Sequence, residues 1–343
     1  MRTALIIGVS GEVLTTSEKT FLRSARPIGF ILFARNCSGH DQIRTLVSDV
    51  KAAVGSDDLL VLIDQEGGRV QRLRPPLGRA LPPADAYARL CISDKSAACY
   101  AARAAARLVA EDLIALGINT NCTPVLDVPV AGAHSVIGDR AFGNTPEQVA
   151  MLGRAVADGF MSGGVLPVIK HIPGHGRATK DSHHDLPVVT ESRAVLSATD
   201  FAPFKALRDM PAAMTAHVVF TEIDASAPAS TSVIVTRDII RGEIGFDGLL
   251  MSDDLSMRAL TGSIRENAEA VICAGSDVAL HCNGDLAEMQ AAAEGVPAVA
   301  GLALARLNRA LGVLQTRQPF DRQAAETILA SVLAGHSRAA ESV

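Results

Sequence analysis

Short apolar runs recur along the chain at intervals that leave room for a helix between most of them. Runs of this length, rich in β-branched and aliphatic residues, are typical of buried strands. They occur at residues 4–9, 28–33, 59–63, 118–122, 166–169, 213–217, 249–251 and 278–280. Segments of helical pattern lie between them, at residues 42–54, 97–116, 145–162 and 236–243, with a glycine soon after each. The pattern predicts a repeated strand–helix unit.

The predicted strands are apolar throughout rather than alternately apolar and polar. Uniform apolarity indicates burial on both faces, as in a parallel sheet covered by helices. Eight such strands in series favour an α/β fold, a (β/α)8 TIM-type barrel. An open doubly wound sheet is the alternative, but the turn at residues 8–11 is a poor match to a dinucleotide-binding motif. We expect a single catalytic domain over residues 1–343, with closing helices at 298–316 and 322–333.

The composition is that of an ordinary globular protein, with 48% hydrophobic residues, 20% charged residues and a formal net charge of −5. The chain has no basic tract, no Trp and 2 Tyr, which argues against nucleic acid as a partner. No run approaches the roughly 18 apolar residues of a membrane span, so we expect no membrane partner. Residues 1–9 are interpreted as a core strand rather than a signal peptide, and six cysteines without a CxxC pair favour reduced thiols. We therefore expect a cytoplasmic protein without a metal.

Polar side chains stand at or directly after the ends of the later strands. They are Asp64 and Glu66 at the third strand, Lys170 and His171 at the fifth, His217 at the sixth, Asp253 and Asp254 at the seventh, and His281 at the eighth. In a (β/α)8 barrel the reactive groups collect at the carboxyl ends of the strands. The predicted barrel would bring these side chains to one pocket.

The residues support a carboxylate nucleophile with a separate proton donor. No Ser or Cys occupies a nucleophile elbow. Because side chains alternate along a strand, we expect one of Asp253 and Asp254 to face a substrate and the other to cap or brace its surroundings. In the loop after the fifth strand, His183 can give and take a proton near neutral pH, and Asp181 is spaced to hydrogen-bond its ring. A retaining glycosidase needs such a pair of functions.

Four motifs give the chain a family resemblance. They are IDQEGGRVQRLR from Ile63, IGDRAFG from Ile137, KHIPGHG from Lys170 with DSH from Asp181, and FDGLLMSDDLSM from Phe246. In this order they resemble glycoside hydrolase family 3, specifically its single-domain bacterial β-N-acetylglucosaminidases (β-hexosaminidases). Ile172 replaces the Phe of the familiar KHFPGHG, which changes packing rather than chemistry. Each motif alone is weak, and together they are specific.

The resemblance implies a barrel enzyme without a cofactor that removes terminal β-linked N-acetylglucosamine (GlcNAc). Its usual substrates would be muropeptides in peptidoglycan recycling. The resemblance implies that Asp253 is the nucleophile, that His183 is the acid/base, and that Asp181 is the partner of His183. His184 follows directly, but His183 is the one that completes the Asp-Ser-His spacing. The residues implied in sugar binding are Asp64, Arg72, Arg140, Lys170 and His171.

Three other functions stay open on the residues. A metal-dependent hydrolase could use the scattered histidines, although Lys170 beside them would oppose a cation. A phosphorylase is compatible with a histidine acid/base, because imidazole would not repel phosphate as a carboxylate would. A non-catalytic sugar-binding barrel would leave Asp253 dispensable.

Several polar residues also have structural interpretations. Glu66 and Arg69 are expected to pair or cap locally, and His175 is expected to hold the base of the loop. His217 could equally line the pocket or be a core histidine. Lys170 and His171 could form a buried ion-pair element that supports the strand ends.

Overall fold

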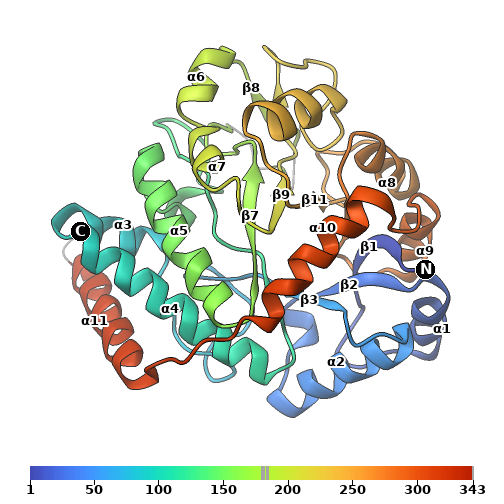
Figure 1. The fold of residues 1–343 in the computed structure, drawn as a ribbon, viewed down its shortest axis with the longest axis horizontal. Coiled ribbons are helices and arrows are strands. Elements are labelled where there is room, and N and C mark those ends of the chain that lie inside the picture. The colour runs from blue at the N-terminus through green and yellow to red at the C-terminus, as the bar shows by residue number, and fades with distance from the viewer. Residues whose placement is uncertain (179–181, 183–184, 342–343) are drawn as a thin grey trace.

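The computed structural model describes residues 1–178, 182 and 185–341, and within them eight parallel strands close into one barrel (Figure 1). Around the barrel the order is β1-β12-β11-β9-β7-β6-β3-β2. The strands are β1 (Thr3–Gly8), β2 (Pro27–Leu32), β3 (Leu60–Ile63), β6 (Thr120–Asn121), β7 (Leu166–Ile172), β9 (Ala212–Thr215), β11 (Leu249–Asp254) and β12 (Val278–His281). The predicted strands and the predicted (β/α)8 fold are confirmed, with small shifts at the strand ends.

Side chains alternate between two buried layers along each strand. In β1, Ala4 and Ile6 pack with the residues that fill the barrel, whereas Leu5 and Ile7 pack outward against the helices. All four are at most 2% exposed. Burial on both faces explains why the strand sequences are uniformly apolar.

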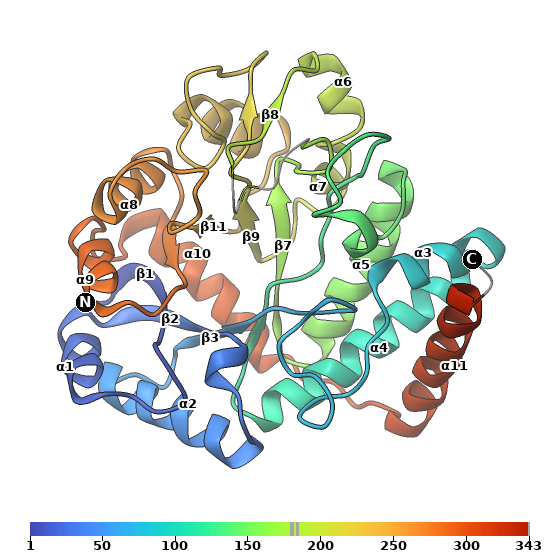
Figure 2. The ribbon, with the colours of Figure 1, turned by 180° about the vertical axis from the view of Figure 1, so that it is seen from behind.

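Helices cover the outside of the barrel (Figures 1 and 2). They are α1 (Thr16–Ala25), α2 (His40–Val54), α3 (Ala84–Ser93), α4 (Lys95–Ala115), α5 (Pro146–Ser162), α6 (Arg193–Ala198), α7 (Ala202–Ala206), α8 (Ile264–Cys273), α9 (Leu286–Glu294), α10 (Gly301–Gly312) and α11 (Arg322–Glu341). Three-residue 3₁₀ turns are η1 (Ala34–Asn36), η2 (Gly138–Arg140) and η4 (Val313–Gln315). The two predicted closing helices correspond to α10 with η4 and to α11, which packs on α3 and α4.

Local sequence sets several helix ends. Before α5, the Thr145 side chain accepts a hydrogen bond from the backbone N–H of Gln148, and Pro146 fits the first turn. Ser263 and Glu266 form a reciprocal capping box at the start of α8. Helix α2 ends at Gly55, whose φ of 71° is the left-handed conformation that glycine adopts without a steric cost.

One predicted helix differs in kind. Residues 236–243 lie in a π-helix, η3 (Val235–Glu243), rather than in an α-helix. The backbone N–H of Ile244 donates to the carbonyl of Ile239, five residues back, at 2.8 Å. Apolar residues four apart lie on one face in both helix types, so the sequence pattern did not distinguish them.

Short elements stand at the carboxyl end of the barrel. The hairpin of β4 (Gln65–Gly67) and β5 (Val70–Gln71) follows β3, and β8 (Val188–Val189) pairs in parallel with β10 (Val219–Phe220). Figure 1 shows β7 pointing toward β8 and α6. Strand β7 also continues three residues beyond the predicted end, so Lys170 and His171 lie within it.

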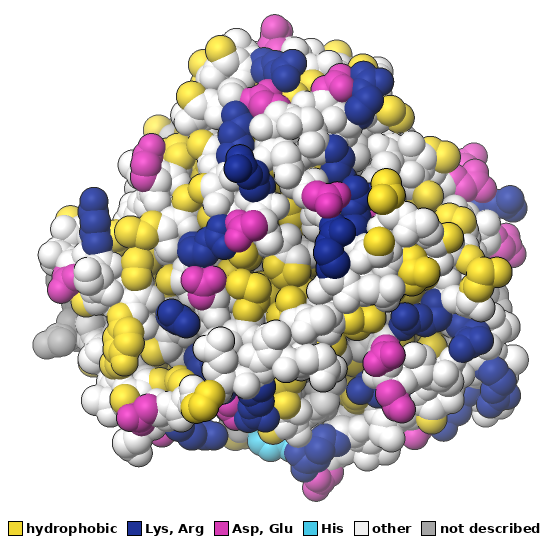
Figure 3. All heavy atoms as spheres, in the orientation of Figure 1, with side chains coloured by type: hydrophobic (Ala, Val, Ile, Leu, Met, Phe, Trp, Pro, Cys, Tyr) yellow, Lys and Arg dark blue, Asp and Glu magenta, His cyan; other side chains and the backbone are white. Residues whose placement is uncertain are grey.

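The outer surface, where the structure describes it, has no strongly charged patch on the face drawn in Figure 3. On the face shown in Figure 3, acidic and basic side chains are interspersed. Among the residues described, none of the helices combines the length and the apolar character needed to cross a membrane.

Candidate active site

A cavity of about 430 Å³ opens at the carboxyl end of the barrel. Its lining includes Asp64, Arg72, Arg140, Lys170, His171 and Asp253, all of which the sequence singles out. They come from β7, β11, η2 and the segment that follows β3. The structure therefore brings these six residues together. Asp181, His183 and His184 lie outside the described residues.

Lys170 is the central cation of this cavity. Its Nζ lies 2.8 Å from Oδ1 of Asp64 and 2.7 Å from Oε1 of Glu66. The side chain is 3% exposed, so the two carboxylates replace the water that the ammonium group has lost. Burial alone would lower the pKa of Lys170, but the two carboxylates outweigh it and raise this pKa. The ammonium group is therefore charged at neutral pH.

Two arginines complete the group, which we call the floor: Asp64, Glu66, Arg72, Arg140 and Lys170. Arg140 donates to both carboxylate oxygens of Glu66, each at 2.8 Å, and Arg72 donates to Oδ2 of Asp64 at 2.9 Å. Burial raises the pKa of both carboxyl groups, but the neighbouring cations outweigh burial. The pKa of Glu66 falls to about 2, and that of Asp64 falls well below its usual range.

The partners of Glu66 and Arg69 are distant in sequence, so the expectation of local pairing was wrong. Glu66 bonds Arg140 and Lys170, while Arg69 donates to Asp139 at 2.9 Å and to backbone carbonyls near it. The 3₁₀ turn η2, which follows a long loop, supplies both distant partners Asp139 and Arg140. The two-residue spacing from Asp64 was a usable signal for Glu66, because alternate residues of an extended chain share a side.

Asp253 lines the same cavity with far fewer partners. Its Oδ1 accepts one hydrogen bond, at 2.8 Å, from the backbone N–H of Asp254. No ion pair to it is found within the part of the chain that the structure describes. Burial alone would raise the pKa of Asp253, but His217, His171 and Lys170 together lower it. The carboxylate is ionised, and among the described residues no charged donor occupies its lone pairs.

Asp254 braces the end of β11 instead. Its carboxylate accepts hydrogen bonds from the backbone N–H groups of Ser256 and Cys282, at 3.1 and 3.0 Å, and from the Ser256 hydroxyl at 2.6 Å. Although Asp254 also contributes to the cavity wall, its oxygens are engaged. Asp254 thus braces its surroundings, as one of the two aspartates was predicted to do, but both line the cavity, so strand alternation does not place them on opposite sides.

A buried carboxylate that the sequence analysis did not single out orients His171. Nδ1 of His171 donates to Oδ2 of Asp127 at 2.7 Å, which leaves Nε2 as the ring nitrogen available to a ligand. Asp127 is 0% exposed; burial would raise its pKa, but His171 and His175 lower it. The available signal was a lone carboxylate in the apolar run at residues 124–130.

The two ambiguous histidines have different settings. His175 lines the cavity, and its backbone N–H donates to Oδ1 of Asp127 at 2.7 Å, which fixes the base of the loop as expected. His217 is fully buried, with Nδ1 2.6 Å from the Ser230 hydroxyl and Nε2 3.0 Å from the carbonyl of Asp254. It does not line the cavity and is a core histidine that holds the end of β11.

The histidines do not gather into a ligand set in the described part of the chain. Within it, no three His, Cys, Asp or Glu side chains are placed to hold one metal ion. Lys170 occupies the position between Asp64 and Glu66 that a divalent cation would need.

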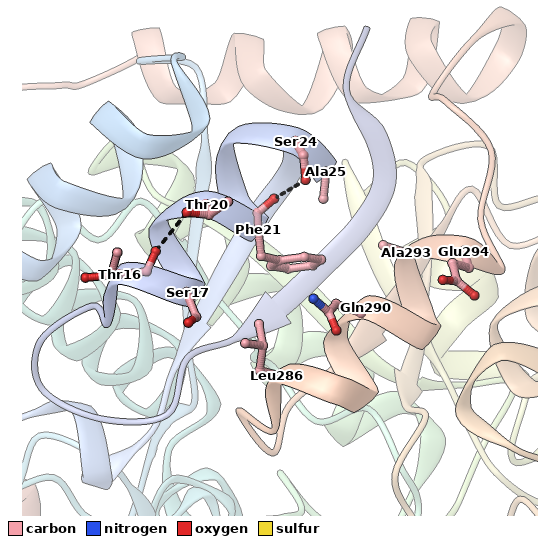
Figure 4. Close-up of a pocket in the computed structure, with 10 residues that line it drawn as sticks. All are labelled: Thr16, Ser17, Thr20, Phe21, Ser24, Ala25, Leu286, Gln290, Ala293 and Glu294. Atoms are coloured by element: carbon pink, nitrogen blue, oxygen red, sulfur yellow. Dashed lines mark hydrogen bonds between the residues drawn. The ribbon is translucent and has the colours of Figure 1, made fainter.

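A second depression lies far from these residues, between α1 and α9 (Figure 4). It has a volume of about 750 Å³ and is lined by Thr16, Ser17, Thr20, Phe21, Ser24, Ala25, Leu286, Gln290, Ala293 and Glu294. Glu294 is the one ionisable residue of this lining. Its chemistry does not match that of the barrel cavity, which remains the candidate active site.

Comparison with known proteins agrees with the motifs. The family described as glycosyl hydrolase family 3 N terminal domain matches residues 12–315. A β-hexosaminidase of Bordetella avium is 41% identical over 289 residues, which cover 83% of this chain and 82% of the relative. A β-hexosaminidase of Methylococcus capsulatus is 41% identical over 277 residues, 80% of each chain.

Solved structures share the fold over nearly the whole chain. NagZ from Neisseria gonorrhoeae has a TM-score of 0.85 at 35% identity, over 96% of this chain and 98% of that one. A family 3 β-N-acetylglucosaminidase from a Paenibacillus species has a TM-score of 0.77 at 31% identity, over 95% of this chain and 61% of that one.

Proposed function

Because the chain belongs to glycosyl hydrolase family 3 and is a glycoside hydrolase, we propose that it is a retaining exo-β-N-acetylglucosaminidase. It removes terminal β-linked GlcNAc, and its substrates are muropeptides of peptidoglycan recycling. The observation that carries the proposal is a single cavity lined by both Asp253 and the charged floor. Among the described residues, the carboxylate of Asp253 has few hydrogen-bond partners. The named activity of the similar enzymes supports the choice of sugar.

The floor is suited to hold sugar hydroxyls. Carboxylates of Asp64 and Glu66 accept hydrogen bonds from hydroxyls, and Lys170, Arg72 and Arg140 donate to them. Each of these groups is already oriented by a charged neighbour, so little reorganisation is needed when a sugar binds. The fixed floor would set the terminal sugar in place with its anomeric carbon beside Asp253.

In the first chemical step, a carboxylate oxygen of Asp253 attacks the anomeric carbon while the bond to the leaving oxygen breaks. His183 gives that oxygen a proton, so the aglycone leaves as an alcohol. In the second step water attacks the glycosyl ester, His183 takes a proton from the water, and Asp253 is released. Asp181 fixes the His183 ring and stabilises its protonated form. These roles of Asp181 and His183 rest on the sequence motif.

The first test compares an aryl β-N-acetylglucosaminide with the matching β-glucoside, with phosphate varied and a chelator as a control. We expect the protein to cleave the β-N-acetylglucosaminide, to cleave the β-glucoside only weakly, and to be unaffected by the chelator. A glycosyl phosphate product would make the protein a phosphorylase instead, and loss of activity with the chelator would make it a metal-dependent hydrolase. A first-formed sugar of inverted configuration would contradict the covalent intermediate.

We further propose that the chain acts as one catalytic domain in the cytoplasm on a small carbohydrate partner. All six cysteines are free thiols, which suits a reducing compartment. Fractionation of the cells that make the protein would test the location.

A further inference from the structure

Ser182 lies between Asp181 and His183 in the sequence. It contacts two residues that come from different segments around the cavity. Its side chain is buried, with 3% of the residue exposed, and it contributes to the cavity lining. Its hydroxyl lies 3.3 Å from Nε2 of His175. Its carbonyl accepts a hydrogen bond, also at 3.3 Å, from the backbone N–H of Ala259. This serine therefore has two fixed neighbours.

The first neighbour, His175, belongs to the sugar-binding side. Its backbone is tied to Asp127, the same carboxylate that orients His171. The next residue, Gly176, lies so close to the backbone of Val128 that an added Cβ would come within 2.0 Å of the Val128 carbonyl oxygen. The backbone at His175 is thus fixed by the segment that follows β6.

The second neighbour, Ala259, belongs to the nucleophile side. It follows β11, which carries Asp253, and it is 2% exposed. The turn between them is closed by a hydrogen bond of 3.2 Å from Met257 N–H to the Asp254 carbonyl. Ser182 thereby connects the segment after β7 with the segment after β11.

The contact between His175 and Ser182 is between neutral groups. Burial, with a smaller contribution from His171, lowers the pKa of His175 to about 4, so its ring is uncharged at neutral pH. Nδ1 of His175 is buried and has no hydrogen-bond partner among the described residues. Among the described residues, the serine hydroxyl is therefore the polar contact of the ring, and its effect is on position rather than on charge.

We propose that His175 and Ser182 are positioning residues, whose mutual hydrogen bond aids proton transfer by the acid/base pair that flanks Ser182 in the sequence. The inference rests on the proposed function, because it takes His183 as the acid/base. Proton transfer needs donor and acceptor within about 2.6–3.2 Å, and general acid catalysis supplies roughly 10²- to 10⁴-fold in rate. Loss of the hydrogen bond would forfeit part of that gain without disturbing the floor.

The experiment compares kcat/KM for two β-N-acetylglucosaminides. The dinitrophenyl glycoside has a leaving group that needs no proton, and the methyl glycoside has one that does. In Ser182→Ala and in His175→Leu we expect about a 10- to 100-fold loss on the methyl glycoside and less than about a 3-fold loss on the dinitrophenyl glycoside. Ser182→Thr, which keeps a hydroxyl, should recover most of the loss.

Two controls separate positioning from a general loss of structure. Ser230→Ala breaks a second buried serine–histidine contact, at His217, and should leave the ratio between the two substrates at the wild-type value. The double variant Ser182→Ala/His175→Leu should be no worse than the poorer single variant, because both changes remove one bond.

The outcomes are distinct. If the wild-type protein cleaves neither substrate, the proposed function fails. If it cleaves both and Ser182→Ala keeps the wild-type ratio, the positioning role is overturned, and His175→Leu decides the question should Ser182→Ala not fold. A ratio altered to the same extent by Ser230→Ala also overturns the role.

Discussion

The floor and Asp253 share one cavity, but their charges are balanced in different ways. In the floor, three cations and two carboxylates bond to one another, and Lys170 alone bridges two carboxylates. Among the described residues, Asp253 accepts a single hydrogen bond, from a backbone N–H. Mutual pairing holds the floor side chains in place, whereas sparse pairing leaves the oxygens of Asp253 available for the proposed attack on carbon. Four measurements test this contrast.

The largest effect is expected from Asp253→Asn. The amide has the shape of the carboxylate but is not a nucleophile, so kcat/KM should fall by at least about 10⁴-fold. Because the carboxylate has few partners, the free energy of unfolding should change by less than about 1 kcal/mol. Steady-state kinetics and urea unfolding measure the two quantities. Substantial residual turnover would mean that Asp253 is not the nucleophile.

Lys170→Met should lower the free energy of unfolding strongly, unlike Asp253→Asn. It leaves Asp64 and Glu66 buried without their shared cation, and the free energy of unfolding should fall by about 3–5 kcal/mol. Lys205→Met is the matched control, because Lys205 pairs with Glu243 at a partly exposed site and should cost about 1 kcal/mol or less. Equal losses in the two variants would contradict the idea that Lys170 stabilises both carboxylates of the floor.

Acid should weaken the floor within a defined pH range. The folded-state pKa of Glu66 is lowered to about 2, so its contribution is complete above the unfolded value of about 4.3 and is lost as pH falls toward 2. One such group contributes up to about 3 kcal/mol over this range. We expect the free energy of unfolding, measured with urea, to fall between about pH 5 and about pH 2.5. Glu66→Gln should make this fall less steep. If Glu66→Gln left this pH dependence unchanged, the ionised carboxylate of Glu66 would not stabilise the folded protein.

Arg140→Lys should give the smallest change. The charge stays, but the two parallel bonds to Glu66 become one, with a loss of about 1–2 kcal/mol in unfolding free energy. Arg154→Lys loses the same two-bond geometry with Asp209 at an exposed site and should cost less. If Arg154→Lys lost more unfolding free energy than Arg140→Lys, burial would not explain how strongly the floor pairs stabilise the protein.

The strands and the barrel could be predicted because they depend on a repeated local pattern. Uniformly apolar runs follow from burial on both faces, and each was visible in the sequence. The π-helix η3 could not be predicted, because the apolar pattern is compatible with both helix types. The extension of β7 through Lys170 was missed for another reason: a buried lysine inside a strand depends on carboxylates that come from β3 and its hairpin.

The site could be predicted where a motif names the residue and not where partners meet through the fold. Asp64, Arg140 and Asp253 stand in distinct motifs, and the barrel brings them to one cavity. Asp127 belongs to none of those motifs, and its importance follows from the ring of His171 and the backbone of His175. Such pairing depends on three-dimensional neighbours that a single sequence does not reveal.

The closure of the barrel has a consequence for biosynthesis. The first strand, β1, pairs with the last, β12, through contacts such as Ile7 with His281. At a translation rate of about 5–20 residues per second, the stretch between them takes roughly 15–55 s to synthesise. Through that interval the nascent sheet carries two open edges, which invite pairing with other chains. The ribosome-bound chain thus contains all five floor residues before Asp253 has been made, and the barrel can close only after β12 has joined the two edges.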